Sequence, residues 1–312
     1  MSGTPGTFIS TSTPYASRQI VLQFQLGNGQ SFDNSGSNTL TLSGLRVFAL
    51  FENAFGTTLP NCVMQIYGMT LAHMNALTVA GTYIYGVNKP GKNTVSVAAG
   101  VVNGPLATIF NGTIIEAYPD GQQPNMAFFV RAMYAANLRY AKVTPTSFNG
   151  SVPVSTVMQT IASKSGVGFE NNNVNSVLAY PYFEGPAFKQ FTAAAAAAGA
   201  YVYFDSLKNT VAIWPKPNGS RAQSNILVSS ETGMIDYPQL QSAGIAVKTI
   251  YDPSLVFVPG EPFEVRSQFA AANGLWTPTT CNINISSQMP KGPWEIKVSG
   301  YPKNFPAKPG GN

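Results

Sequence analysis

The first part of the chain alternates hydrophobic and polar positions with the period of a β-strand. Apolar residues stand at 20, 22, 24 and 26 and glutamines at 19, 23 and 25, as in a strand with one buried face. Asn28-Gly29 then gives a strong signal for a tight hairpin turn. A short helix at 70–77 and a turn at 88–91 separate further β-favouring runs at 39–50, 62–69, 83–85, 94–97 and 109–118. This pattern predicts a β-barrel or β-sandwich for residues 18–118.

In the centre of the chain the apolar spacing changes to that of helices. One helix is expected over Ser155–Ser165, and a second from Pro186 to a C-cap at Gly199, with six consecutive alanines in its last turns. Two β-favouring runs, 201–204 and 210–214, follow as a hairpin joined by residues 205–209. Together with a strand pair at 126–130 and 138–143, these elements predict a compact α+β domain for residues 119–225.

The period of two returns towards the C-terminus. Runs at 226–228, 244–250, 263–267 and 296–298 predict a second β-barrel over residues 226–301. Residues 1–17 are rich in Ser, Thr, Gly and Pro and are interpreted as a flexible N-terminal arm that orders only against a partner, and residues 302–312 as a loose C-terminal tail. The predicted fold is mainly β with a smaller α+β part, in which an α+β domain bridges two β-barrels.

The chain carries few charges. Charged residues make up 10% of the sequence, against roughly 25% in soluble domains. Because obligate interfaces are poor in charge, this composition favours a surface that is largely hidden against other subunits. An extracellular β-protein with a neutral polar surface is the alternative. The net charge of +5 is scattered along the chain, so it is a weak indication of nucleic-acid binding.

Residues suited to catalysis or metal binding are few. Cys62 and Cys281 are the only cysteines, and two free thiols are expected rather than a disulfide. A zinc site is not expected with one histidine, His73, which is interpreted as an ordinary, partly buried side chain. Glu261 and Glu264 are interpreted as solvated charges at a strand end. Without a nucleophile elbow, an HExxH helix or a Walker loop, the sequence predicts no enzyme, no cofactor and no metal site.

The N-terminal segment has neither the charged nor the apolar region of a signal peptide. No window offers eighteen consecutive apolar residues. We therefore expect no membrane span, and synthesis in the cytoplasm.

Several segments resemble the baseplate hub proteins of contractile-tailed bacteriophages. ETGMIDYPQL, which begins at Glu231, and AGIAVKTIYDPSLVFVPGEPFEVRS, which follows it, are similar to the start of the distal barrel of these hubs. VSTVMQTIASKSG and the helix and hairpin at 185–217 resemble the middle domain, and GPLATIFNGTIIEAY resembles the closing strands of the first barrel. KGPWEIKVSGY departs from the family, whose second barrel closes with a His-Gly-Asp-like turn.

The resemblance implies two tail-tube-like barrels in each subunit, and a homotrimeric ring that adapts a sixfold tail tube to a threefold central spike. Its partners would be the tail tube protein and the central spike protein, with further contacts to tape measure and wedge proteins. DNA would only pass through the lumen. The protein would reside in the virion, in the tail baseplate, after synthesis in the host bacterial cytoplasm. The interface candidates are the residues of the first resembling segment: Glu231, Thr232, Gly233, Met234, Ile235 and Asp236.

Two other functions remain open from the sequence. The chain has 14 Tyr and 3 Trp, which suits a glycan-binding β-protein of a virion or cell surface. A tail-associated cell-wall hydrolase, with Glu261 and Glu264 as its carboxylates, is the second alternative.

Overall fold

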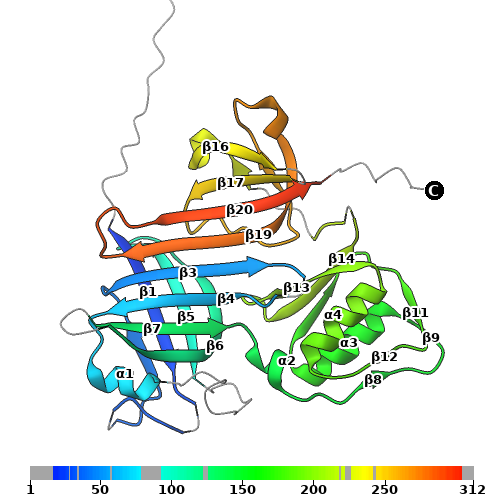
Figure 1. The fold of residues 1–312 in the computed structure, drawn as a ribbon, viewed down its shortest axis with the longest axis horizontal. Coiled ribbons are helices and arrows are strands. Elements are labelled where there is room, and N and C mark those ends of the chain that lie inside the picture. The colour runs from blue at the N-terminus through cyan, green and yellow to red at the C-terminus, as the bar shows by residue number, and fades with distance from the viewer. Residues whose placement is uncertain are drawn as a thin grey trace, which may run out of the picture.

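The computed structural model describes residues 17–303, apart from 28, 34, 57, 79–92, 122–125, 218, 222–225 and 242–243. Thirteen of the described strands form one large β-sheet, and a smaller α+β unit, residues 134–217, packs beside it (Figure 1). The prediction of a mainly β fold with a smaller α+β part is confirmed. The sequence predictions for the arm at 1–16, the run at 83–85, the turn at 88–91 and the tail from 304 lie outside the described residues.

The N-terminal half of the large sheet has the order β3-β4-β7-β6-β5-β1-β2. Its core forms because every second side chain of a strand points inward, so Ile20, Leu22 and Phe24 are buried. The predicted run at 39–50 is divided by a turn into two strands. The strands are β1 (Arg18–Gln25), β2 (Thr39–Leu42), β3 (Arg46–Ala54), β4 (Asn61–Tyr67), β5 (Thr94–Val101), β6 (Leu106–Asp120) and β7 (Ala127–Met133). The predicted short helix is confirmed as α1 (Leu71–Leu77), where Thr70 accepts a hydrogen bond from the His73 backbone N–H.

One strand pair was wrongly predicted. The run at 126–130 does not pair with 138–143, because β7 lies between β4 and β6 in the large sheet. The first residues of the second run instead end helix α2 (Ala136–Tyr140), which buries Ala136 and Leu138. The reason is that the alternating core positions of β7, Phe128 among them, complete the core under β4 and β6. The large sheet therefore continues past residue 119, where the sequence had suggested a boundary.

The middle unit contains both helices predicted for it. α3 (Val154–Ser165) ends at Gly166 with a φ of 71°, and α4 (Ala187–Ala197) precedes Gly199 with a φ of 66°. The predicted hairpin is confirmed as β13 (Ala200–Asp205) and β14 (Thr210–Pro215). β10 (Gly168–Asn171), which was not predicted, pairs in parallel with β14. Two short ribbons join β8 (Thr146–Ser147) to β12 (Tyr182–Phe183) and β9 (Ser151–Pro153) to β11 (Val177–Ala179).

The C-terminal half of the large sheet continues in the order β16-β17-β20-β19, and β18 and β15 branch from β19. The predicted runs near 227, 247, 264 and 297 are confirmed as strands. β16 and β19 were not predicted. The elements are β15 (Leu227–Val228), η1 (Ser230–Thr232), β16 (Met234–Gln241), β17 (Gly244–Ile250), β18 (Phe263–Val265), η2 (Ala270–Ala272), β19 (Gly274–Ser287) and β20 (Trp294–Pro302).

The two halves of the large sheet join directly through β3 and β19. Eight residue pairs are in antiparallel register, from Thr280 opposite Ala54 to Ser287 opposite Val47, and Figure 1 shows β20, β19, β3 and β4 side by side. One hydrophobic core contains residues of both halves. The halves are therefore joined by main-chain hydrogen bonds, and not only through the middle unit. Closure of each half into a separate barrel stays a prediction.

Within the described residues, no helix has both the length and the apolar character that a membrane crossing requires.

Candidate functional site

An aromatic cluster holds the middle unit against both halves of the large sheet. The Phe55 ring, just beyond β3, lies 4.7 Å from the Tyr201 ring and 5.5 Å from the Trp214 ring, measured between centroids. Tyr301 of β20 lies 6.0 Å from Tyr201. Aromatic pairs at these separations stabilise a contact beyond the area that they bury. We conclude that the three parts of the chain are held in a fixed arrangement at this junction.

A buried arginine reinforces the same junction. The side chain of Arg221 has no exposed surface, and it forms a bidentate pair with Glu170 of β10, through Nε to Oε1 at 3.0 Å and Nη2 to Oε2 at 2.7 Å. Its Nη1 lies 3.3 Å from Asp205 Oδ2 and 3.7 Å from Glu261 Oε1. The Arg221 backbone N–H donates to the Gly260 carbonyl at 2.8 Å. The segment that leads from the middle unit into the C-terminal half is thereby fixed to both.

The pKa values of the arginine and its main partner shift as expected for a buried ion pair. The hydrogen bonds from Arg221 lower the pKa of Glu170, although partial burial opposes this. Burial disfavours the charged form of Arg221, but the hydrogen bond to Glu170 and the carboxylates around it outweigh burial and raise its pKa. Both groups therefore remain ionised, and a buried charge so paired has a structural role in this position.

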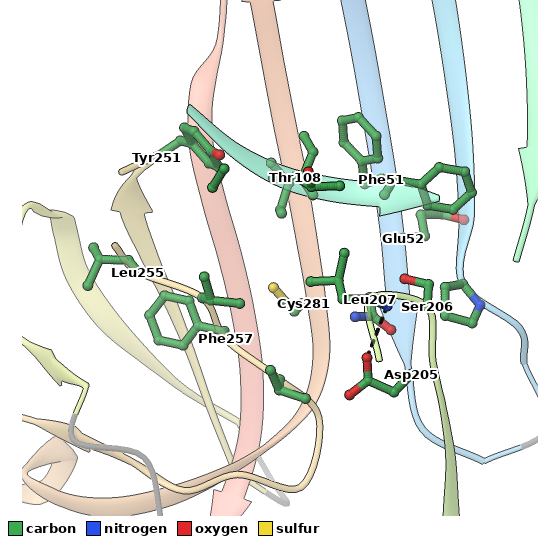
Figure 2. A pocket seen from close by; sticks show the side chains of 18 of the residues that line it. Phe51, Glu52, Thr108, Asp205, Ser206, Leu207, Tyr251, Leu255, Phe257 and Cys281 are labelled. Atoms are coloured by element: carbon green, nitrogen blue, oxygen red, sulfur yellow. Dashed lines mark hydrogen bonds between the residues drawn. The ribbon is translucent and has the colours of Figure 1, made fainter. Parts of the chain in front are cut away.

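A small cavity lies beside this junction (Figure 2). Its volume is about 50 Å³, which holds a few water molecules but is far smaller than the pockets that bind metabolites. Figure 2 shows Tyr251, Leu255 and Phe257 on one side and Asp205 and Ser206 on the other. The cavity is therefore a packing gap between three parts of the chain, with no arrangement of an active site.

The predicted interface residues form a turn and the start of a strand. In η1, the Thr232 hydroxyl accepts from the Ser229 backbone N–H at 2.8 Å and donates to the Leu227 carbonyl at 2.7 Å. Gly233 has a φ of 95°, a conformation that glycine adopts without strain. Met234 then begins β16, so the turn leads directly into the strand at the end of the large sheet.

β16 is an edge strand of the large sheet. In the described part of the chain it pairs only with β17, and the register shifts between Ile235 and Gln239, where Asp236 has a φ of 61°. Its outer side carries exposed apolar residues, since Tyr237 is 57% and Leu240 54% exposed. The Tyr237 ring lies 4.9 Å from the Phe269 ring. An exposed edge strand with apolar side chains is a site for pairing with another chain.

The opposite end of the same sheet is also an edge. β2 pairs with β1 alone among the described strands. Among the described strands, the large sheet thus has an unpaired edge at each end, on different parts of the chain. Such different edges support a head-to-tail association, which closes into a ring when the rotation between copies permits.

The candidate catalytic residues are not arranged for chemistry. Glu261 is mostly buried beside Arg221, and Lys208 Nζ lies 3.6 Å from its carboxylate. The interpretation of Glu261 as a solvated charge was therefore wrong, because the carboxylate is paired with these two cations. Glu264 pairs with Arg266 at 2.8 Å on the surface. His73 is half-buried beside the Phe32 ring. The described residues contain no group of three or more His, Cys, Asp or Glu that could hold a metal ion.

The two cysteines are free, as predicted, and both are buried. Burial raises the pKa of the Cys281 thiol to about 12 and that of Cys62 well above its usual value. Both thiols are therefore protonated and unreactive at neutral pH, which fits a role in packing.

The sequence profile of the family described as baseplate hub gp41 matches residues 32–291, which includes the sheet junction, the middle unit and the edge strand. The chain belongs to the baseplate hub gp41 family. Membership in this family makes it a phage tail protein of the baseplate, part of the virion. The resemblance to baseplate hubs found in the sequence is confirmed. No sequence among the curated proteins matches the chain.

Solved structures of tail proteins share the fold of this hub family member. It matches the 43 kDa tail protein of prophage MuSo2 from Shewanella oneidensis with a TM-score of 0.60 at 8% identity, over 92% of this chain and 97% of the other. It matches the tail protein from Neisseria meningitidis MC58 with a TM-score of 0.58 at 8% identity, over 91% and 96%.

A third similar structure is the E. coli c3393 protein, a component of the type VI secretion system described as structurally similar to the T4 tail proteins gp27 and gp5. The TM-score is 0.55 at 12% identity, over 83% of this chain and 74% of the other. At these identities the likeness shows a shared fold, and it adds no assignment of individual residues.

Sequence reasoning missed the residues that make the junction. Arg221 stood between the predicted elements and belonged to none of them. Phe55 followed the predicted strand run at 39–50 and fitted neither a helical nor an alternating pattern. Their contacts lie 51 and 146 positions away, at Glu170 and Tyr201. Because no local period links such residues, the only available signal was the unusual density of aromatic residues in the hairpin at 201–214.

Proposed function

We propose that this protein is the structural hub of a contractile phage tail baseplate, as a homotrimeric ring. The ring adapts the sixfold tail tube to the threefold central spike. The observation that carries the proposal is the large sheet, which runs unbroken through both halves of the chain and ends in a different edge strand on each side. Three such chains, each with two tube-like halves, present six units to a tube.

The paired edges supply the contacts of the ring. β16, with the turn at Glu231–Asp236, lies at one end of the sheet, and β2 lies at the other. Edge strands of neighbouring subunits can pair through their unused main-chain groups. The low charge of the chain fits extensive subunit interfaces, because the cores of such interfaces are poor in charged residues. DNA then passes through the lumen without being read, because a transit surface needs no base contacts.

The partners in this proposal are the tail tube and central spike proteins, with tape measure and wedge proteins as further contacts. The protein acts without catalysis, and it is made in the cytoplasm of the host bacterium before it enters the virion. The family match supports this role over a glycan-binding protein or a cell-wall hydrolase.

The molar mass in solution tests the proposal. Light scattering and native mass spectrometry of the full chain should give three times 33.1 kDa. Co-sedimentation with purified tail tube protein should then show that the trimer binds the tube. A chain that stays monomeric at all concentrations, alone and with tube and spike proteins, would contradict the proposal.

A further inference from the structure

An open cleft of about 540 Å³ separates the large sheet from the middle unit. One side is the outer face of β2, β1, β5 and β6, which are neighbours in the sheet. The other side is formed by the start of α2, the end of α3 and the β13–β14 turn. We call it the polar cleft. It is separate from the small cavity at the junction and from the edge strand β16.

The floor of the polar cleft consists of two rows of hydroxyl and amide side chains that cross the strands. In antiparallel strands, residues in direct register point to the same face. One row is Thr39, Gln25, Thr94 and Thr113, and the second contains Gln23, Ser96 and Asn111.

These floor side chains have hydrogen-bonding capacity to spare. Gln23, Gln25, Ser96, Asn111 and Thr113 form no side-chain hydrogen bond with any other described residue. Each of the three amides offers two N–H donors and a carbonyl acceptor. The floor can therefore bind a ligand that has many neutral donors and acceptors.

The wall of the polar cleft is held in place. The Tyr134 hydroxyl donates to Asn209 Oδ1 at 2.8 Å, and Asn209 Nδ2 donates to the Gly166 carbonyl at 3.4 Å. These bonds connect the β7–α2 link, the end of α3 and the β13–β14 turn. The cleft is thus formed before any ligand enters it.

The lining chemistry selects the class of ligand. The described residues that line the polar cleft include no Asp, Glu, Lys, Arg or His, so phosphate groups and nucleic acids find no counter-charge. Tyr134, the one aromatic side chain among these described lining residues, is buried and offers no ring face for a sugar or a base. An uncharged polypeptide segment, whose main chain alternates donors and acceptors, fits this lining best.

We infer that the polar cleft binds residues 1–16 of a copy of this chain. This segment contains no charged side chain, and seven of its sixteen residues are Ser or Thr, which suits a neutral hydroxyl and amide floor. Its length also suffices: β1 leads from Arg18 to the cleft at Gln25, about 25 Å at 3.3 Å per residue, and sixteen extended residues span up to about 50 Å. The inference does not depend on the number of subunits in the ring.

Photo-crosslinking in the full chain tests the inference. With p-benzoylphenylalanine in place of Phe8, irradiation followed by peptide mass spectrometry should give cross-links to 94–96, 111–113 or 165–167. A mixture of isotopically light and heavy chains shows whether the segment comes from the same copy or a neighbour. Cross-links only to other parts of the chain, or none, would overturn the inference. The inference would also be overturned if p-benzoylphenylalanine in place of Tyr85 gave cross-links to these residues and the probe in place of Phe8 gave none.

A matched pair of variants separates binding in the cleft from chance proximity. Gln23→Glu with Gln25→Glu removes two amide donors and adds two charges that a covering segment would bury. The cross-link yield should fall by about fivefold or more, a loss of about 1 kcal/mol. Gln19→Glu changes a half-buried residue on the same side of β1 outside the cleft and should leave the yield unchanged. An equal effect of both changes would refute the inference, with thermal unfolding as the check on folding.

Discussion

Arg221 Nη2 lies 2.7 Å from Glu170 Oε2, and the arginine side chain has no exposed surface. The two residues come from the segment that enters the C-terminal half and from β10 of the middle unit. This pair, together with the aromatic contacts of Phe55, fixes the position of the middle unit on the large sheet. Under the proposed function, a hub that joins a tail tube to a spike needs such rigidity at this contact.

Replacing Arg221 by Met should destabilise the protein strongly. It leaves the Asp205 carboxylate buried without its arginine and removes one partner each from Glu170 and Glu261, and breaking a buried ion pair typically costs about 3–5 kcal/mol. Chemical denaturation followed by circular dichroism measures the loss. Arg266→Met, which breaks the exposed pair with Glu264, should change the free energy of unfolding by less than about 1 kcal/mol. Equal effects of the two changes would contradict the role of Arg221.

Gly260 should not tolerate a side chain. Its φ is +87°, and a Cβ atom would lie 2.7 Å from two carbon atoms of the Trp214 ring. We expect Gly260→Ala to lower the free energy of unfolding by about 2–4 kcal/mol, from backbone strain and overpacking together, and to change Trp fluorescence. Gly274→Ala is the control, because Gly274 has a φ of +132° but no atom within 4 Å of the added Cβ. The steric explanation fails if both changes have the same effect.

A charge on the edge strand should prevent ring assembly. Leu240→Lys places an ammonium group on the exposed face of β16 (54% exposed), and lysine on an edge opposes pairing with another strand. Light scattering should then report a monomer, with the free energy of unfolding of the subunit within about 0.5 kcal/mol of wild type. Val177→Lys, on the middle unit with Val177 61% exposed, should leave the trimer intact. A trimer that persists in Leu240→Lys would exclude β16 from the interface.

Stability should fall in alkaline solution, in part through Tyr301. Burial raises the pKa of Tyr301 to about 12, and its hydroxyl donates to the Gly219 carbonyl at 3.3 Å. In the unfolded chain the pKa is about 10. The contribution of Tyr301 to the free energy of unfolding is therefore complete below pH 10, and it is lost as the pH rises from 10 to 12. Chemical denaturation at pH 8, 10 and 11 should show a smaller decrease of the free energy of unfolding in Tyr301→Phe than in the wild type. An identical pH dependence in the two proteins would contradict the role of Tyr301.

The two thiols should be inaccessible in the folded protein. Cys62 and Cys281 are buried, and burial raises the pKa of each, so the reactive thiolate is scarce at neutral pH. Ellman's reagent should detect almost no thiol in the native protein and two per chain in denaturant. Ser151→Cys adds an exposed cysteine as a positive control. Rapid reaction of two thiols in the native wild type would show that the core opens readily.

The sequence by itself determined the elements whose stability is local. Apolar spacing and glycine caps located α3 and α4, and alternation located β1 and the hairpin of β13 and β14, because helix hydrogen bonds and hairpin turns join residues that are close in sequence. The resemblance in the segment from Glu231 identified the family. These features need no knowledge of distant neighbours.

Only the tertiary structure decided how distant segments combine. β19 contains few alternating apolar residues, and β7 lay beyond an apparent boundary, yet both complete the large sheet. The pairing of β3 with β19 joins residues such as Ala54 and Thr280, and its register depends on packing of a shared core. Arg221 and the carboxylates around it are likewise brought together only by the packing of the whole chain. Long-range pairs carry no period in the sequence, so the continuous sheet emerges only when the whole chain packs.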